Sequence, residues 1–163
     1  MEGFASGEVK HRDCFTSTSR VLCLFQGAKI AAVRKLQHEL GINPSHLPPE
    51  AFKYLTRLHY CAADISPANG EATGWGEHEM DYILFAQANV DLMPNPEEVQ
   101  AVAFVNEAEL KEMMSPSSGL LWSPWFRIIV SKFLSPWWKD LNQTLKTDAM
   151  VNWETIHHIS DLN

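Results

Sequence analysis

The chain has 163 residues, of which 45% are hydrophobic and 20% are charged, as expected for one folded globular domain. A formal net charge of −7 gives no general attraction for a nucleic-acid backbone, and no apolar run approaches the roughly 20 residues of a membrane span. The three scattered cysteines contain no Cys-x-x-Cys pair, which argues against a disulfide framework and favours a reducing, cytosol-like compartment.

The first 26 residues are predicted to form a divergent and partly disordered lead, because residues 1–20 are polar and show no hydrophobic period. Within this lead, residues 21–25 (VLCLF) are apolar and predict a short buried strand. Gln26 and Gly27 would end that strand.

A helix is predicted over residues 28–40. Val33, Leu36 and Leu40 are spaced three and four residues apart, which places them on one apolar stripe of a helix. Gly41 is expected to end the helix in a left-handed conformation, with the apolar Ile42 making the contact beyond the end.

Three strands are predicted in the middle of the chain. Residues 52–62 alternate in strand fashion, and residues 75–90 form a second strand after a polar loop. Pro94 and Pro96 cannot lie inside a sheet ladder, so they are expected to turn the chain before a third strand at residues 99–105.

Two helices are predicted after the strands. Asn106 and Glu109 have the spacing of a capping box, which predicts a short helix to about Met114. Ser123 and Pro124 have the order of an N-cap and first helical residue, and the apolar segment that follows predicts a long buried helix. A second proline at position 136 is expected to kink or restart that helix.

This order of elements does not alternate strictly between strand and helix. It therefore predicts an α+β fold, with a mixed β-sheet between helices, in one domain over residues 27–163.

The second predicted strand carries acids at every second position, in the stretch WGEHEMDY. Since alternate residues of a strand share a face, Glu77, Glu79 and Asp81 are predicted to project together. His78, Met80 and Tyr82 are predicted to point to the opposite face. A solvated sheet face is one interpretation of this pattern. The other is a functional site, because neighbouring carboxylates can share a divalent cation or move a proton.

Other residues have similar alternatives. Lys35 and Glu39 form either a solvated i,i+4 ion pair or part of a degenerate Nudix box, whose tail the stretch RKLQHELG resembles. Trp125 either packs in the core or offers its ring to a cation. Tyr60 is either a strand aromatic or a proton-handling group.

Together these segments resemble type I isopentenyl-diphosphate Δ-isomerase of the eukaryotic kind, a family with a Nudix-like fold. The resemblance covers about residues 28–160 and is most specific in WGEHE-x-DY and SPWF. The matching stretches, in family order, are AAVRKLQHELGI (31–42), YLTRLHY (54–60), WGEHEMDYILF (75–85), VDLMPNPEEV (90–99), SPWFRIIVSKFL (123–134) and the tryptophan pair at 137–138.

The resemblance implies an enzyme of isoprenoid biosynthesis that interconverts isopentenyl and dimethylallyl diphosphate by protonation and deprotonation. It implies Mg²⁺ on the diphosphate and a second divalent metal, Mg²⁺, Mn²⁺ or Zn²⁺, at Glu77 and Glu79. Glu79 would also transfer a proton, with Tyr60 beside it as the other catalytic group. Glu39 would help to hold the diphosphate-bound Mg²⁺.

The resemblance further implies that Lys35, Glu39 and Trp125 bind the substrate. Lys35 stands where the family usually has arginine. The paired hydrogen bonds that a guanidinium can donate are therefore replaced by the single compact charge of an ammonium. Trp125 would face the carbocation that lies between the two proton transfers.

The chain departs from the family upstream, where no Cys-Ser-His-Pro motif is present, so the Nudix-like sheet is expected to be incomplete on its N-terminal side and the activity reduced. The competing hypothesis is a catalytically inactive variant that binds a diphosphate or a protein partner, with self-association or pairing with a full-length isomerase. The last residues, SDLN, are not an SKL-type peroxisomal address, so a cytoplasmic location is expected.

Overall fold

A computed structural model describes residues 17–65 and 71–159 of the chain. The chain order and bounds of the elements are α1 (Ser17–Leu40), η1 (Pro49–Ala51), β1 (Lys53–Ile65), β2 (Ala72–Phe85), α2 (Glu107–Met113), η2 (Pro116–Ser118), α3 (Pro124–Ile129), η3 (Val130–Leu134), α4 (Ser135–Lys139), α5 (Leu141–Lys146) and β3 (Ile156–Ile159). Of the described helices, none has the length and apolar content that a membrane span needs.

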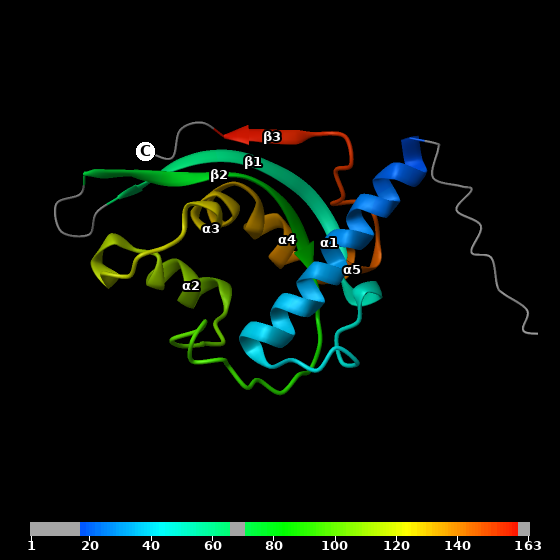
Figure 1. Cartoon of the computed structure of the whole chain (residues 1–163), viewed down its shortest axis with the longest axis horizontal. Helices are drawn as coiled ribbons and strands as arrows, with labels where there is room; N and C mark the ends of the chain where they lie inside the picture. Colours follow the sequence, from blue (N-terminus) through cyan, green and yellow to red (C-terminus); the bar gives the residue numbers. More distant parts are fainter. Residues whose placement is uncertain (1–16, 66–70, 160–163) are drawn as a thin grey trace, which may run out of the picture.

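The sheet has the strand order β2-β1-β3, with β2 antiparallel and β3 parallel to β1. It curves around α3 and α4, while α1 crosses the end of the sheet where β1 begins (Figure 1). The predicted α+β class with a mixed sheet between helices is therefore confirmed over the described residues.

The main hydrophobic core lies between one face of the sheet and the helices α2, α3 and α4. We call this the inner face. Leu58 and Tyr60 are fully buried there, against Leu110 of α2, Ile128 of α3 and Trp137 of α4. This core fixes the position of the buried inward side chains of the two strands, such as Leu58, Tyr60 and Ile83.

A second cluster joins α1 to the opposite, outer face near the end of the sheet. Phe25 of α1 contacts the rings of Tyr54, Tyr82 and Trp153, with ring centroids 4.0–5.9 Å apart. Further along α1, the predicted apolar stripe packs over Phe52. The helix is thus held by its apolar face, as amphipathic helices generally are.

The helix predicted over residues 28–40 is confirmed, but it begins much earlier, at Ser17. The strand predicted at residues 21–25 and its end at Gln26 and Gly27 are therefore wrong. A run of five apolar residues fits a buried strand or a helix equally well, and here it continues the helix. Residues 1–16 of the predicted lead lie outside the described residues.

Gly41 ends α1 as predicted, with a φ of +66°. Its N–H donates to the carbonyl of Gln37, and the N–H of the buried Ile42 donates to the carbonyl of Leu36. A β-carbon at position 41 would lie 2.6 Å from the backbone oxygen of Met93. Both the conformation and the close approach of the chain favour glycine there.

The first two predicted strands are confirmed as β1 and β2, although β2 ends at Phe85 instead of residue 90. The third predicted strand, at 99–105, is wrong, because these residues pair with no described strand. β3 and α5 were not predicted.

The helices after the sheet begin at the predicted signals, but the predicted long buried helix is divided into α3, η3 and α4, and only one side of it is buried. Asn106 and Glu109 form the complete capping box of α2. α3 begins at Pro124 after Ser123, whose side chain makes no capping hydrogen bond. The predicted disturbance at Pro136 takes the form of the π-helical turn η3, which precedes α4 and widens the helix where proline has no N–H to donate to the i−4 carbonyl.

Candidate functional site

The pairing of β1 and β2 places the acidic side chains on the inner face. Tyr60 lies opposite Glu79 and Leu58 lies opposite Asp81, and directly opposed residues of an antiparallel pair share a face. Glu77 is opposite the buried Ala62 and belongs to the same row. The predicted common projection of the three carboxylates is therefore present in the structure.

Tyr60 and Glu77 are joined by a diagonal hydrogen bond across the two strands. The Tyr60 hydroxyl donates to Oε2 of Glu77 at 2.7 Å, and the Tyr60 side chain is fully buried. Burial raises the pKa of the Tyr60 phenol, and the hydrogen bond to Glu77 and the nearby charge of Asp81 raise it further. Tyr60 consequently keeps its proton and acts as a donor at neutral pH.

Asp81 is the acid of this row with the most perturbed ionisation. Burial raises the pKa of its carboxyl to about 6, and the charges of Glu79 and Glu77 add to the increase. The cause is a row of like charges on a partly desolvated strand, with no cationic side chain of the described residues bonded to it.

Trp125, in the first turn of α3, lies beside two of these acids. A cavity of about 260 Å³ is lined by Glu79, Asp81, Ile83 and Trp125, together with Tyr82. We call it the acidic cavity. Its composition is unusual because two carboxylates and an indole ring share one small space with an apolar wall.

An apolar groove of about 410 Å³ adjoins the acidic cavity and shares Trp125 and Ile83 with it. It runs along the end of β2, between α1 and α3, and Lys35 of α1 lies at it. The ammonium of Lys35 is paired with Glu39 at 2.5 Å, and this hydrogen bond raises the pKa of Lys35.

The structure thus brings together most of the predicted site residues but not all of them. Glu79 and Trp125 share the acidic cavity, Tyr60 bonds to Glu77, and Lys35 reaches the adjoining groove. Glu39 is on α1, where its carboxylate binds Lys35, and it lines neither the acidic cavity nor the apolar groove.

The predicted metal ligands make an incomplete set in the described part of the chain. One oxygen of Glu77 accepts the hydrogen bond from Tyr60. Carboxylate oxygens suit Mg²⁺ or Mn²⁺. However, no group of three or more His, Cys, Asp or Glu among the described residues is arranged to hold an ion. These side chains would supply only part of a coordination shell.

Sequence reasoning placed Asp81 in the acidic row but gave it no role in the site. The signal that could have found it is the alternation itself, since Glu77, Glu79 and Asp81 are equivalent positions of one strand face. What separates them is exposure, because Glu79 is exposed, Glu77 and Asp81 are partly buried, and the row ends at the buried Ile83.

The side chains that alternate with the acids along β2 lie on the outer face. His78 points away from the acids, as predicted, and its Nε2 lies 2.9 Å from Nε2 of His59. Nδ1 of His59 in turn lies 3.0 Å from Nδ1 of His158 on β3. This row of imidazoles links all three strands on the side opposite the acidic cavity.

Comparison with known proteins assigns the same region of the chain to one family. The NUDIX domain family matches residues 26–126. The isopentenyl-diphosphate delta-isomerase of Schizosaccharomyces pombe is 48% identical over 129 residues, which are 78% of this chain and 52% of that protein. Corresponding isomerases of Gibberella zeae and Bos taurus are 44% and 40% identical, with 82% of this chain and 49% and 55% of those proteins covered. The chain spans about half the length of the curated relatives that it matches.

Proposed function

The chain belongs to the NUDIX domain family and is a relative of the type I isopentenyl-diphosphate Δ-isomerases, and from this premise we propose that it interconverts isopentenyl and dimethylallyl diphosphate. The observation that carries the proposal is the acidic cavity, in which the carboxylate of Glu79 and the ring of Trp125 face one space. A carboxylate moves protons, and an indole ring stabilises a cation.

The reaction requires one proton to be added and another to be removed. Protonation of the terminal alkene carbon gives a tertiary carbocation, and loss of a proton from the carbon on the diphosphate side forms the new double bond. Glu79 is proposed to carry one of these protons. Tyr60 is proposed to be the neighbouring proton-handling group, and its buried hydroxyl, bonded to Glu77, positions that carboxylate.

The surroundings of the acidic cavity suit a short-lived cation. The face of Trp125, which is 39% exposed in the structure, offers negative charge density worth about 2 kcal/mol or more once a bound substrate desolvates it. Ile83 is buried and the adjoining groove is lined mainly by apolar side chains, so this side of the cavity presents few nucleophiles and little water to the cation.

Contacts to the diphosphate remain proposals. Lys35 lies at the groove next to Trp125, where its ammonium can attract an anionic group. Glu39 is proposed to share the Mg²⁺ that accompanies the diphosphate, and Glu77 and Glu79 to contribute to a second divalent ion. Because these side chains form only part of a shell in the described chain, no step above passes through a metal.

The test is turnover of ¹³C-labelled isopentenyl diphosphate, followed by NMR with Mg²⁺, Mn²⁺ or Zn²⁺ added in turn. Dimethylallyl diphosphate, with solvent deuterium in its new methyl group, is expected to form with at least one of the added metals. A chelator should abolish this turnover. Absence of product and of deuterium exchange under every metal would end the proposal.

Trp125 gives a second test of the cavity. Trp125→Ala is expected to lower kcat by about 30-fold, equivalent to 2 kcal/mol, while Trp125→Phe, which keeps an aromatic face, loses less. Substrate affinity should change little, because the cation exists only during the reaction. The matched control is Trp153→Phe, since Trp153 packs on Tyr54 on the outer face. Equal kcat values for Trp125→Ala and the unchanged chain would contradict the assignment.

The alternative of an inactive diphosphate- or partner-binding protein is not borne out by the comparisons. Self-association and pairing with a full-length isomerase likewise have no support in the described residues. A cytoplasmic location remains a proposal, and fractionation of cells that express the tagged full chain would test it.

A further inference from the structure

Residues 100–105, which we call the open segment, have unpaired backbone groups. None of their N–H or C=O groups bonds to another described residue, whereas the flanking Val99 and Asn106 N–H groups have acceptors. The segment reads QAVAFV and has the composition of a strand. The strand predicted at 99–105 is therefore a strand-forming sequence that has no partner strand within residues 17–65 and 71–159.

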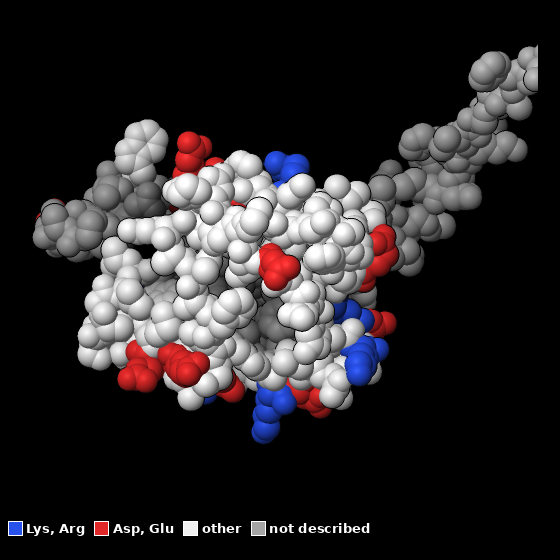
Figure 2. Space-filling view, turned by 90° about the horizontal axis from the view of Figure 1, so that it is seen from below, with Lys and Arg blue, Asp and Glu red and all other residues white. Residues whose placement is uncertain are grey.

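Apolar side chains of the open segment face solvent. Phe104 is 86% exposed and Val102 is 46% exposed, and Leu120, which lines a pocket together with Phe104, is 50% exposed. Single exposed apolar residues are ordinary, but several around one unpaired backbone are typical of an interaction site. The face seen from below has few charged side chains except near its edge, and it is hollowed (Figure 2).

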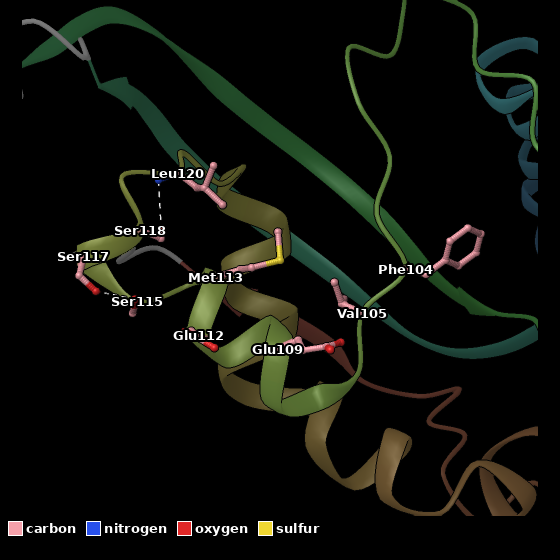
Figure 3. Close-up of a pocket in the computed structure, with 9 residues that line it drawn as sticks. All are labelled: Phe104, Val105, Glu109, Glu112, Met113, Ser115, Ser117, Ser118 and Leu120. Carbon is pink, nitrogen blue, oxygen red and sulfur yellow. Dashed lines mark hydrogen bonds between the residues drawn. The ribbon is translucent and has the colours of Figure 1, made fainter.

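A pocket of about 510 Å³ lies between the end of the open segment and α2. Val105 and Met113 contribute to its wall, the serine turn at Ser115–Ser118 lies at one side, and the Phe104 ring lies at the other and points away (Figure 3). A strand laid beside the open segment would place alternate side chains into such a pocket.

Charge decides which kind of strand fits. The open segment is bounded by acids, with Glu97 before it and Glu107 and Glu112 after it, and only Glu107 is paired, with Lys111. Antiparallel pairing of two copies centred on Val102 would set Glu97 opposite Glu107. Like charges directly opposed destabilise a sheet, so a second copy is disfavoured and basic ends are favoured.

We propose that the open segment accepts one extended segment of another polypeptide as an added β-strand, with alternating apolar residues and lysine or arginine at its ends. Backbone hydrogen bonds would give the affinity, and the apolar pocket and the acids would give the selectivity. The proposal is independent of the reaction, because none of the open segment's residues lines the acidic cavity.

The probe is the peptide Lys-Val-Thr-Val-Thr-Val-Lys, compared with its charge-reversed twin Glu-Val-Thr-Val-Thr-Val-Glu. The lysine peptide is expected to bind the full chain with a dissociation constant below about 1 mM and at least about tenfold more tightly than the twin. Hydrogen exchange should slow at residues 100–105. Equal binding of the two peptides, no protection, or protection at the free edge of β2 would overturn the proposal.

Two proline variants test the backbone contact itself. Successive N–H groups of an extended chain point to opposite sides, so only one of Val102→Pro and Ala103→Pro removes a hydrogen bond to the peptide. One variant should lose at least tenfold in peptide affinity while the other loses less. Both should keep the circular dichroism spectrum, since the open segment has no described hydrogen bond to lose. Unchanged affinity in both variants, or dimers protected at 100–105 without peptide, would refute the added strand.

Discussion

Replacing Glu79 by glutamine is expected to lower isomerase turnover by about 10²–10⁴-fold, the range that general acid–base catalysis contributes. Glutamine keeps the shape of the side chain in the acidic cavity but cannot carry a proton. Substrate binding should persist, because the contacts proposed for the diphosphate involve Lys35 and Glu39 instead. The measurement is kcat by NMR, together with deuterium incorporation from solvent, which reports proton transfer separately from binding.

The matched control for this prediction is Glu154→Gln. Glu154 is exposed and lines neither the acidic cavity nor the apolar groove, so the same chemical change should leave kcat within a factor of two or so. A loss of less than tenfold in Glu79→Gln would contradict the assignment. If Asp81→Asn then caused the larger loss, the proton carrier would be the second acid of the cavity.

Glu79 is proposed as the proton carrier in preference to Glu77 because the two carboxylates have different surroundings. Glu77 accepts the hydrogen bond from Tyr60, whose buried ring holds that carboxylate in place. Glu79 has no such donor among the residues that the structure describes, and it lines the cavity together with Trp125. An untethered carboxylate beside the cation site is free to move a proton, whereas a tethered one orients its neighbours.

The elements that the sequence predicts well are those whose signal is local. The alternation in β1 and β2 sets which side chains face inward, and a slip by one residue would expose Leu58 and Tyr60. The capping box at Asn106 and the glycine at position 41 specify helix ends through their own backbone neighbours.

The elements that were missed depend on partners distant in sequence. β3 has only four residues and exists because Arg57 to Tyr60 of β1 pair with it. Residues 99–105 have the composition of a strand, but composition alone does not provide a neighbouring strand for them to pair with. Residues 21–25 show that a short apolar run is ambiguous, because the helix that continues through them decides their conformation.

The candidate site was predictable only in part for the same reason. Strand alternation alone groups Glu77, Glu79 and Asp81, but only tertiary packing brings Trp125, more than forty residues later, to the same cavity. The partnership of Tyr60 with Glu77, and not with the directly opposed Glu79, is a diagonal contact that follows from the side-chain packing of the sheet.

Leu58→Ala is expected to lower the free energy of unfolding by about 2–5 kcal/mol. Leu58 is fully buried on the inner face, between the strand and the helices that cover it, so alanine would leave a cavity that the packed core cannot close. Urea unfolding followed by circular dichroism measures the change. Ile30→Ala, which removes apolar atoms from a side chain that is 54% exposed, is the control and should cost less than about 1 kcal/mol.

The effect of Leu58→Ala should extend to the acidic cavity, because β1, which carries Leu58, pairs with β2, which carries Glu79 and Asp81 of the cavity. Leu58 precedes Tyr60 by two residues on the same face and lies opposite Asp81. Domains of this size have a free energy of unfolding of only about 5–15 kcal/mol, so the variant would lose a large share of its stability. Activity should then fall at a lower temperature than in the unchanged chain, in step with the loss of structure. A destabilisation below about 1 kcal/mol would show that the inner face is not the core that holds the site together.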